Sequence, residues 1–187
     1  MRSVFLDRDG VLNAVVVRDG RPHPPASAVE LEVLPGVEEA CGQLHRAGFL
    51  LVCVTNQPDI ARRRTTMDAV SAINAALVAR LAVRHFIVCP HSDEDGCACR
   101  KPRPGMLLAA AAEHAIVLSE SVMVGDGWRD VAAGRAAGCR TVYIDRGYAE
   151  PRPARPDFVC RNLPEAASWI IASMIGQGGS SCQLPNG

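Results

Sequence analysis

The chain has 187 residues, and its 20 Lys and Arg balance 20 Asp and Glu, so the formal net charge is zero. This length suits one domain. The charge balance argues against binding of nucleic acid or attachment to a membrane surface, because both depend on a basic excess. No run of 18 apolar residues occurs, and charges interrupt the N-terminus where a signal peptide would be apolar. We therefore expect a cytoplasmic, monomeric, globular protein.

Short apolar runs alternate with stretches of helical spacing. In chain order, strands are expected at 4–6, 49–54, 86–88, 122–124, 141–144 and 158–159, the last at a sheet edge. Helices are expected at 35–48, 66–83, 104–113, 130–137 and 164–175. This alternation predicts an α/β fold with a doubly wound, mostly parallel sheet. Residues 1–175 would form this single domain, and the Gly-rich segment 176–187 a disordered tail.

Polar residues follow the ends of these predicted strands. Asp7 and Asp9 follow the first strand, Thr55 the second and Asp126 the fourth, while Lys101 lies beyond the third. Ligands of doubly wound sheets bind beyond the carboxyl ends of the strands, so these side chains are expected to meet there. Lys101 is the only lysine of the chain, which favours a position that needs a compact ammonium group.

Asp7 and Asp9 lie two residues apart, with Gly10 allowing the chain to turn beneath them. Two such carboxylates can hold a hard cation such as Mg²⁺ through oxygen ligands. They can also divide the work of a nucleophile and a proton carrier. An Asp-x-Asp pair alone also fits an ordinary solvated turn, so its meaning depends on the other strand ends.

Three cysteines and a histidine crowd into a segment of eleven residues: Cys89, His91, Cys97 and Cys99. Three thiolates and one imidazole form a closed four-ligand set, the composition of a structural Zn²⁺ site. The alternative is a chance grouping of reduced cysteines near a histidine. A bound zinc would fix the loop that leads directly into Arg100 and Lys101.

In chain order the motifs read Asp-x-Asp, Thr, Lys and Gly-Asp-x-x-x-Asp, with the opening Asp-Arg-Asp-Gly-Val-Leu-Asn. Over about residues 3–150 they resemble the haloacid dehalogenase (HAD) superfamily of phosphohydrolases. Cys-Pro-His followed by Cys-Ala-Cys-Arg-Lys-Pro-Arg-Pro-Gly-Met resembles the zinc-loop subgroup, which includes heptose-bisphosphate and histidinol-phosphate phosphatases. The resemblance implies a Rossmann-like core. The intervals between motifs leave no room for a cap domain, so an open site is expected.

The resemblance also implies the role of each residue. Asp7 would attack phosphorus and form an aspartyl phosphate, and Asp9 would carry the proton. Mg²⁺ would be held by Asp7, the Asp9 backbone carbonyl and Asp126, with Asp130 in support. The phosphorylated substrate would be held by Thr55, Asn56, Gln57, Arg100 and Lys101.

The expected function is a Mg²⁺-dependent, zinc-stabilised phosphatase of a phosphorylated sugar, with a heptose bisphosphate preferred. Histidinol phosphate or a broader range of phosphomonoesters is the alternative within this class. Four places depart from the pattern of the heptose enzymes: Pro58-Asp59, Arg63, Gly127–Arg129 and the segment 13–35. They lie where contacts with the substrate are expected. A rival from another class is a phosphoacceptor switch of the receiver type, which has no need for Asp9.

Overall fold

A six-stranded sheet forms the centre of the molecule in the computed structural model, which describes residues 1–18 and 21–175. The strand order is β5-β4-β1-β6-β7-β8, and every neighbouring pair is parallel. The strands are β1 (Ser3–Leu6), β4 (Leu50–Asn56), β5 (His85–Cys89), β6 (Val122–Gly125), β7 (Arg140–Ile144) and β8 (Phe158–Cys160). The predicted doubly wound sheet is confirmed, including β8 at its edge. The predicted tail, 176–187, lies outside the described residues.

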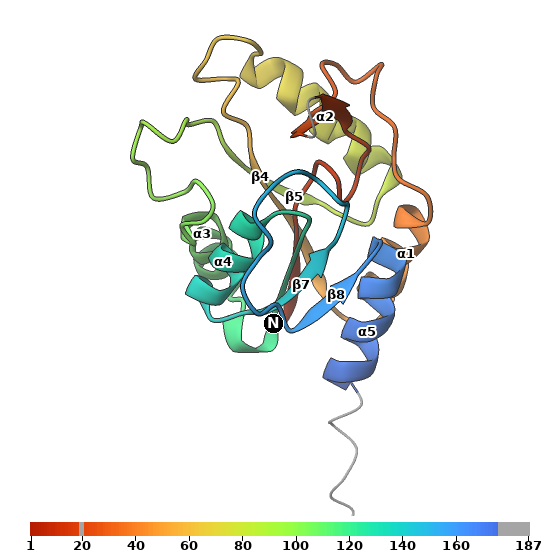
Figure 1. The fold of residues 1–187 in the computed structure, drawn as a ribbon. Helices are drawn as coiled ribbons and strands as arrows, with labels where there is room; N and C mark the ends of the chain where they lie inside the picture. Colours follow the sequence, from red (N-terminus) through yellow and green to blue (C-terminus); the bar gives the residue numbers. More distant parts are fainter. Residues whose placement is uncertain (19–20, 176–187) are drawn as a thin grey trace, which may run out of the picture.

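Helices cover both faces of the sheet (Figure 1). They are α1 (Val37–Arg46), α2 (Met67–Arg80), α3 (Gly105–His114), α4 (Trp128–Ala137) and α5 (Leu163–Ile175), with a short 3₁₀ turn, η1, at Leu118–Glu120. Successive residues of β1 point to opposite faces. Val4 and Leu6 therefore pack with residues of α1, α2 and α5, whereas Phe5 packs with residues of α3 and α4. The inner strands β1, β4, β6 and β7 are buried almost throughout, which explains their continuous apolar runs, whereas the edge strands β5 and β8 are partly exposed.

Local sequence features fix where the helices begin and how closely they approach the sheet. Thr66 precedes α2, and its Oγ1 accepts a hydrogen bond from the Ala69 amide at 3.2 Å. In α4, a Cβ at Gly134 would come within 2.6 Å of Met123 Cβ. This close contact holds α4 against β6, so the residues at the start of α4 lie beside the end of that strand.

A two-stranded antiparallel hairpin, β2 (Val16–Arg18) with β3 (Arg21–His23), was not predicted. The sequence does contain a signal for it, because Asp-Gly separates the two strands and is typical of two-residue hairpin connections. Pro22 lies within β3, which obscured the strand pattern. Within the described part of the chain, every helix is too short or too polar to cross a membrane.

The order of the strands reverses between β1 and β6. From β1 the chain builds outward through β4 and β5, then returns to β6 and builds the other way through β7 and β8. The two halves separate where β1 and β6 lie side by side, which leaves a crevice beyond their carboxyl ends. This crevice is the expected position of a ligand.

Candidate active site

Three aspartates meet at the topological switch point, the place between β1 and β6 where the strand order reverses. Asp7 follows β1, Asp126 follows β6 and Asp130 lies in the first turn of α4. Their carboxylate oxygens lie within 4.8 Å of one another. Asp126 and Asp130 are only 8% and 3% exposed. The structure therefore brings together two separate predicted motifs, and Asp130 joins Asp7 and Asp126 in one cluster.

Lys101 lies among these carboxylates. Its Nζ is 2.9 Å from Asp7 Oδ1 and 2.6 Å from Asp130 Oδ1, and it donates to the Val54 carbonyl at 2.8 Å. Desolvation lowers the pKa of the buried ammonium, but Asp130 and Asp7 outweigh it and the net shift is upward. Asn56 fixes this loop, since its side-chain amide donates to the Lys101 carbonyl and its Oδ1 accepts from the Lys101 amide.

The negative charge at the switch point exceeds what Lys101 balances. Burial, followed by Asp130 and Asp9, raises the pKa of Asp7 to about 7 against the opposing effect of Lys101. Burial, followed by Asp7 and Asp130, also raises the pKa of Asp126 well above its ordinary value. Asp126 Oδ2 is buried without a hydrogen-bond donor in the structure. A cluster of carboxylate oxygens with a surplus of charge fits a hard divalent cation.

Gly10 makes this arrangement possible. Its φ is +81°, and a Cβ at this position would collide with Asp126 Oδ2. A left-handed conformation and a close approach to a carboxylate are both conditions that glycine meets best. Gly10 thus lets the Asp7 and Asp126 segments approach each other.

Asp9 takes its contacts from a network that the sequence reading missed. Its carboxylate accepts hydrogen bonds from Arg8, Asn13 and Gln57, and Gln57 Nε2 also donates to Thr55 Oγ1 at 2.9 Å. Gln57 is 3% exposed, so its side chain connects two predicted site residues rather than reaching into solvent. The clue in the sequence was Arg8 itself, a charged residue next to a buried strand.

An open cleft of about 410 Å³ lies above the switch point. Every predicted substrate and carboxylate residue lines it: Asp7, Asp9, Thr55, Asn56, Gln57, Arg100, Lys101, Asp126 and Asp130. The hairpin contributes Pro22 and His23 to one wall. Arg62, Arg64 and Arg129 also line the cleft, so most cationic groups around it are arginines.

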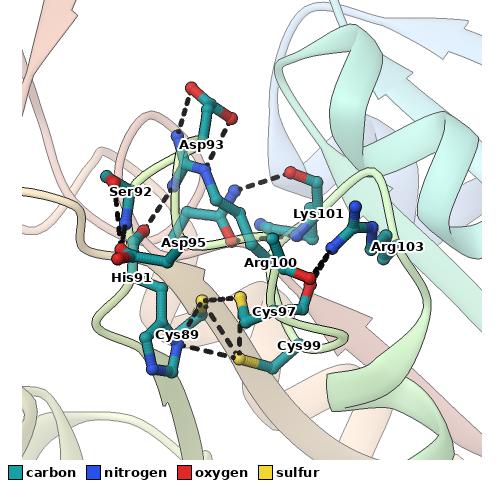
Figure 2. Close-up of polar contacts among 12 residues, drawn as sticks. Cys89, His91, Ser92, Asp93, Asp95, Cys97, Cys99, Arg100, Lys101 and Arg103 are labelled. Carbon is teal, nitrogen blue, oxygen red and sulfur yellow. Dashed lines mark hydrogen bonds and ion pairs between the residues drawn. The ribbon is translucent and has the colours of Figure 1, made fainter.

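The predicted thiolate and imidazole ligands converge at one point (Figure 2). The sulfurs are 3.7 Å apart for Cys89 and Cys97, 3.2 Å for Cys89 and Cys99, and 3.4 Å for Cys97 and Cys99. His91 Nδ1 lies 3.6 and 3.3 Å from the sulfurs of Cys89 and Cys99. A tetrahedron with metal–sulfur bonds of about 2.3 Å has edges of roughly 3.8 Å, so this geometry suits one tetrahedral ion. The four residues form a possible metal site.

Arg100 and Arg103, which follow the four candidate ligands in the chain, contact the loop that carries those ligands (Figure 2). Arg100 Nε donates to Asp93 Oδ1 at 2.8 Å, and its Nη1 donates to the His91 carbonyl at 3.3 Å. Arg103 Nη1 contacts the carbonyls of Gly96 and Cys97. The loop that carries the candidate metal ligands therefore also fixes Arg100 at the mouth of the cleft.

Comparisons with known proteins agree with this geometry. Residues 98–166 match the family described as HAD-hydrolase-like. The D-glycero-beta-D-manno-heptose-1,7-bisphosphate 7-phosphatase of Pseudomonas putida is 37% identical over 155 residues, covering 80% of this chain and 86% of that protein. The Escherichia coli K12 protein of the same name is 34% identical over 184 residues, covering 92% and 89%.

Two solved structures are also similar. One is the D,D-heptose 1,7-bisphosphate phosphatase of Bordetella bronchiseptica complexed with magnesium and phosphate. Its TM-score is 0.77 at 31% identity, covering 92% of this chain and 99% of that one. The other is a putative HAD-like phosphatase of Mesorhizobium loti, with a TM-score of 0.74 at 28% identity, covering 93% and 87%.

A parallel doubly wound sheet with aspartates and a lysine at its switch point, together with these relatives, defines a phosphatase of the haloacid dehalogenase superfamily. Within that superfamily, the chain belongs to the family of the D-glycero-D-manno-heptose-1,7-bisphosphate 7-phosphatases. The family resemblance expected from the sequence motifs is confirmed.

Proposed function

We propose that this enzyme removes one phosphate from D-glycero-D-manno-heptose 1,7-bisphosphate and leaves the monophosphate. The observation that carries the proposal is the convergence of Asp7, Lys101 and Asp126 beneath an open cleft, in a chain that belongs to this family. Asp7 is the nucleophile in this proposal, and Lys101 neutralises phosphoryl oxygens.

The reaction proceeds in two displacements. In the first, an Asp7 oxygen bonds to phosphorus as the bond from phosphorus to the sugar oxygen breaks, and Asp9 gives a proton to that oxygen. In the second, a water oxygen bonds to phosphorus while the bond to Asp7 breaks. Asp9 takes the proton of this water, so each turnover restores both residues. Thr55 and Asn56 support phosphoryl oxygens during both steps.

The residues present fit two metal ions. Asp7, Asp126 and the Asp9 backbone carbonyl would hold Mg²⁺, with Asp130 in support. When bound, this ion supplies positive charge that allows the phosphate and Asp7 to approach each other. The cluster of Cys89, His91, Cys97 and Cys99 would hold structural Zn²⁺, because four protein ligands leave no open position for water.

The second phosphate would be held by arginines at the rim. Arg100 is already oriented by Asp93, and Arg62 and Arg129 line the same cleft. Both of these arginines also act on the Asp93 carboxylate, whose pKa is lowered first by its hydrogen bond from Arg100. This grouping of guanidinium groups suits a substrate with two phosphates.

Phosphate release from a panel of substrates tests the proposal: both anomers of the heptose bisphosphate, histidinol phosphate and simple hexose phosphates. We expect the highest kcat/KM with a heptose bisphosphate. A preference for histidinol phosphate, or no preference, would overturn the substrate assignment but keep the phosphatase. A stable, stoichiometric phosphoprotein without turnover would instead favour the receiver-type switch.

The proposal also covers assembly and location. It describes a single domain over residues 1–175, monomeric and cytoplasmic, that acts on small molecules and has neither nucleic acid nor membrane as a partner. Light scattering after size-exclusion chromatography would test the monomer, and a dimer would show as twice the expected mass.

A further inference from the structure

Arg8 is the largest side chain of the described residues that is completely buried, with 0% exposure. A guanidinium group stays charged in any protein interior, so burying it is unfavourable unless its donors are paired. Its position between Asp7 and Asp9 therefore requires a reason beyond filling space. The partners of its donors supply that reason.

Two nitrogens of the Arg8 guanidinium donate hydrogen bonds to the Asp9 carboxylate. Arg8 Nε donates to Asp9 Oδ1 at 3.2 Å and Nη2 donates to Asp9 Oδ2 at 3.0 Å, a two-point contact that fixes both distance and tilt. The third nitrogen, Nη1, donates to Asn74 Oδ1 at 3.1 Å. Asn74 lies on α2 and is 8% exposed, so the far side of the guanidinium is anchored to a helix.

The remaining contacts of Asp9 complete the arrangement. Asn13 Nδ2 donates to Oδ1 at 2.9 Å and Gln57 Nε2 donates to Oδ2 at 2.8 Å. Each carboxylate oxygen thus has two donors, one of them from Arg8. Only 17% of the Asp9 side chain is exposed, in the direction of the cleft.

We propose that Arg8 is a positioning residue, which with Asn74 holds the Asp9 carboxylate at the place from which it moves protons. This inference rests on the proposed role of Asp9 in the reaction. A group that transfers protons must lie within hydrogen-bond reach of the reacting oxygen, and a misplacement of about 1 Å can cost about 100-fold in rate. Arg8 touches no substrate atom and acts through Asp9 alone.

The test uses p-nitrophenyl phosphate, whose leaving group departs without a proton. In Arg8→Lys, Asp7 still takes the phosphoryl group, so nitrophenolate appears in a burst of about one equivalent per enzyme. Steady turnover then falls about 100-fold, because the water that opens the aspartyl phosphate needs Asp9. With a sugar phosphate, whose alkoxide needs the proton, the burst is absent. Phosphoenzyme trapped by acid quench should accumulate only with the nitrophenyl substrate.

Two further variants keep the test decisive if Arg8→Lys folds poorly. Asn74→Leu removes only the anchor on α2 and should give the same burst pattern with a smaller loss, roughly tenfold. Arg2→Lys is the matched control, because Arg2 Nη2 donates to the Ala47 carbonyl at 3.1 Å, outside the cleft residues. Its kinetics should equal those of the natural enzyme.

The outcomes distinguish the positioning role of Arg8 from the proposed role of Asp9. If burst and steady rate fall together in Arg8→Lys and Asn74→Leu, in proportion to folded protein, Arg8 only supports the fold and the inference is wrong. If Asp9→Asn hydrolyses the aspartyl phosphate at the natural rate, the proposed function of Asp9 fails first. Both of these outcomes are read with p-nitrophenyl phosphate alone, so they do not depend on which sugar is the natural substrate.

Discussion

Asp7 shows how surroundings set the chemistry of a single residue. Burial raises its pKa to about 7, and Lys101 Nζ at 2.9 Å opposes that rise. A carboxylate in this position is poorly solvated yet close to a cation, which suits a nucleophile that must approach a phosphate. Burial and the neighbouring Lys101, rather than the residue type alone, suit this aspartate to the proposed role of nucleophile.

Asp7→Asn should abolish turnover while leaving the fold intact, because the amide has nearly the same shape but cannot form the aspartyl phosphate. We expect a loss on the order of 10³-fold or more in kcat. Phosphate release measures it, and circular dichroism verifies the fold. Activity close to that of the natural enzyme would contradict the role of nucleophile.

Asp126→Asn should change stability with pH in the metal-free protein. The folded pKa of Asp126 is raised, so from about pH 4 upward the folded state binds more protons than the unfolded state. The free energy of unfolding therefore falls as the pH rises, and the asparagine variant escapes that loss. We expect its Tm to exceed that of the natural protein at pH 8, and the gap to close near pH 4.

Thermal melts with a chelator measure this difference, and about 1 kcal/mol corresponds to about 2–4 °C at this chain length. Added Mg²⁺ should reverse the order, since only the natural protein gains full binding energy. An equal difference in Tm at pH 4 and pH 8 would mean that burial does not raise the pKa of Asp126 in the folded protein.

Lys101 offers a chemical test of burial. As the only lysine, it is the expected target of amine-selective reagents beside the N-terminus. The structure changes that expectation, because Lys101 is 2% exposed and ion-paired with Asp7 and Asp130. In the native protein, mass spectrometry should find the modification at Met1 alone, and at Lys101 only after denaturation. Rapid native modification of Lys101 would contradict the buried ion pairs.

Among the elements, the loop between β5 and α3 links stability to function. It follows Cys89 at the end of β5, carries the other candidate metal ligands and then Arg100 and Lys101, and leads into α3 at Gly105. The loop has no strand or helix of its own in the structure. Its shape therefore depends on the contacts among the candidate metal ligands and on the Arg103 contacts with Gly96 and Cys97.

Cys97→Ala should disturb the cleft from outside it. We expect the metal content, measured by atomic emission, to fall from one zinc per chain, and activity to drop roughly 10- to 100-fold. KM should rise more for a bisphosphate than for a monophosphate, because Arg100 loses its fixed position. Cys139→Ala is the matched control, since that buried thiol lies outside the cluster. Unchanged metal content in Cys97→Ala would contradict the ligand assignment.

The elements also show what sequence patterns can reveal. The six strands of the sheet were predictable because each is a continuous apolar run, and helices were bounded by Gly and Pro signals. The hairpin was not predicted because each of its strands is three residues long and β3 contains Pro22. The first strand does lie in an apolar run, Ala14–Val17, but its partner β3 is polar and contains Pro22, so the two strands do not share one recognisable pattern.

At the scale of the whole molecule, the switch point turns separate motifs into one site. Sheet topology alone predicts that residues after β1 and β6 meet, so Asp7 and Asp126 were accessible to sequence reasoning. The pairing of Arg8 with Asn74 was not, because it depends on how α2 packs over the sheet. Side-chain partners 66 residues apart leave no local pattern in the sequence.

The cleft opens directly to solvent, and within residues 1–18 and 21–175 nothing larger than a hairpin and loops stands over it. The groups proposed to hold the reacting phosphate, Thr55, Asn56 and Lys101, lie at the end of β4 and in the loop between β5 and α3. Binding of the phosphate therefore requires no movement of one domain against another. Crystals grown without ligand should consequently tolerate soaking with phosphate and Mg²⁺, keeping their cell dimensions. Cracking or a large change in lattice on soaking would reveal a hidden closing motion.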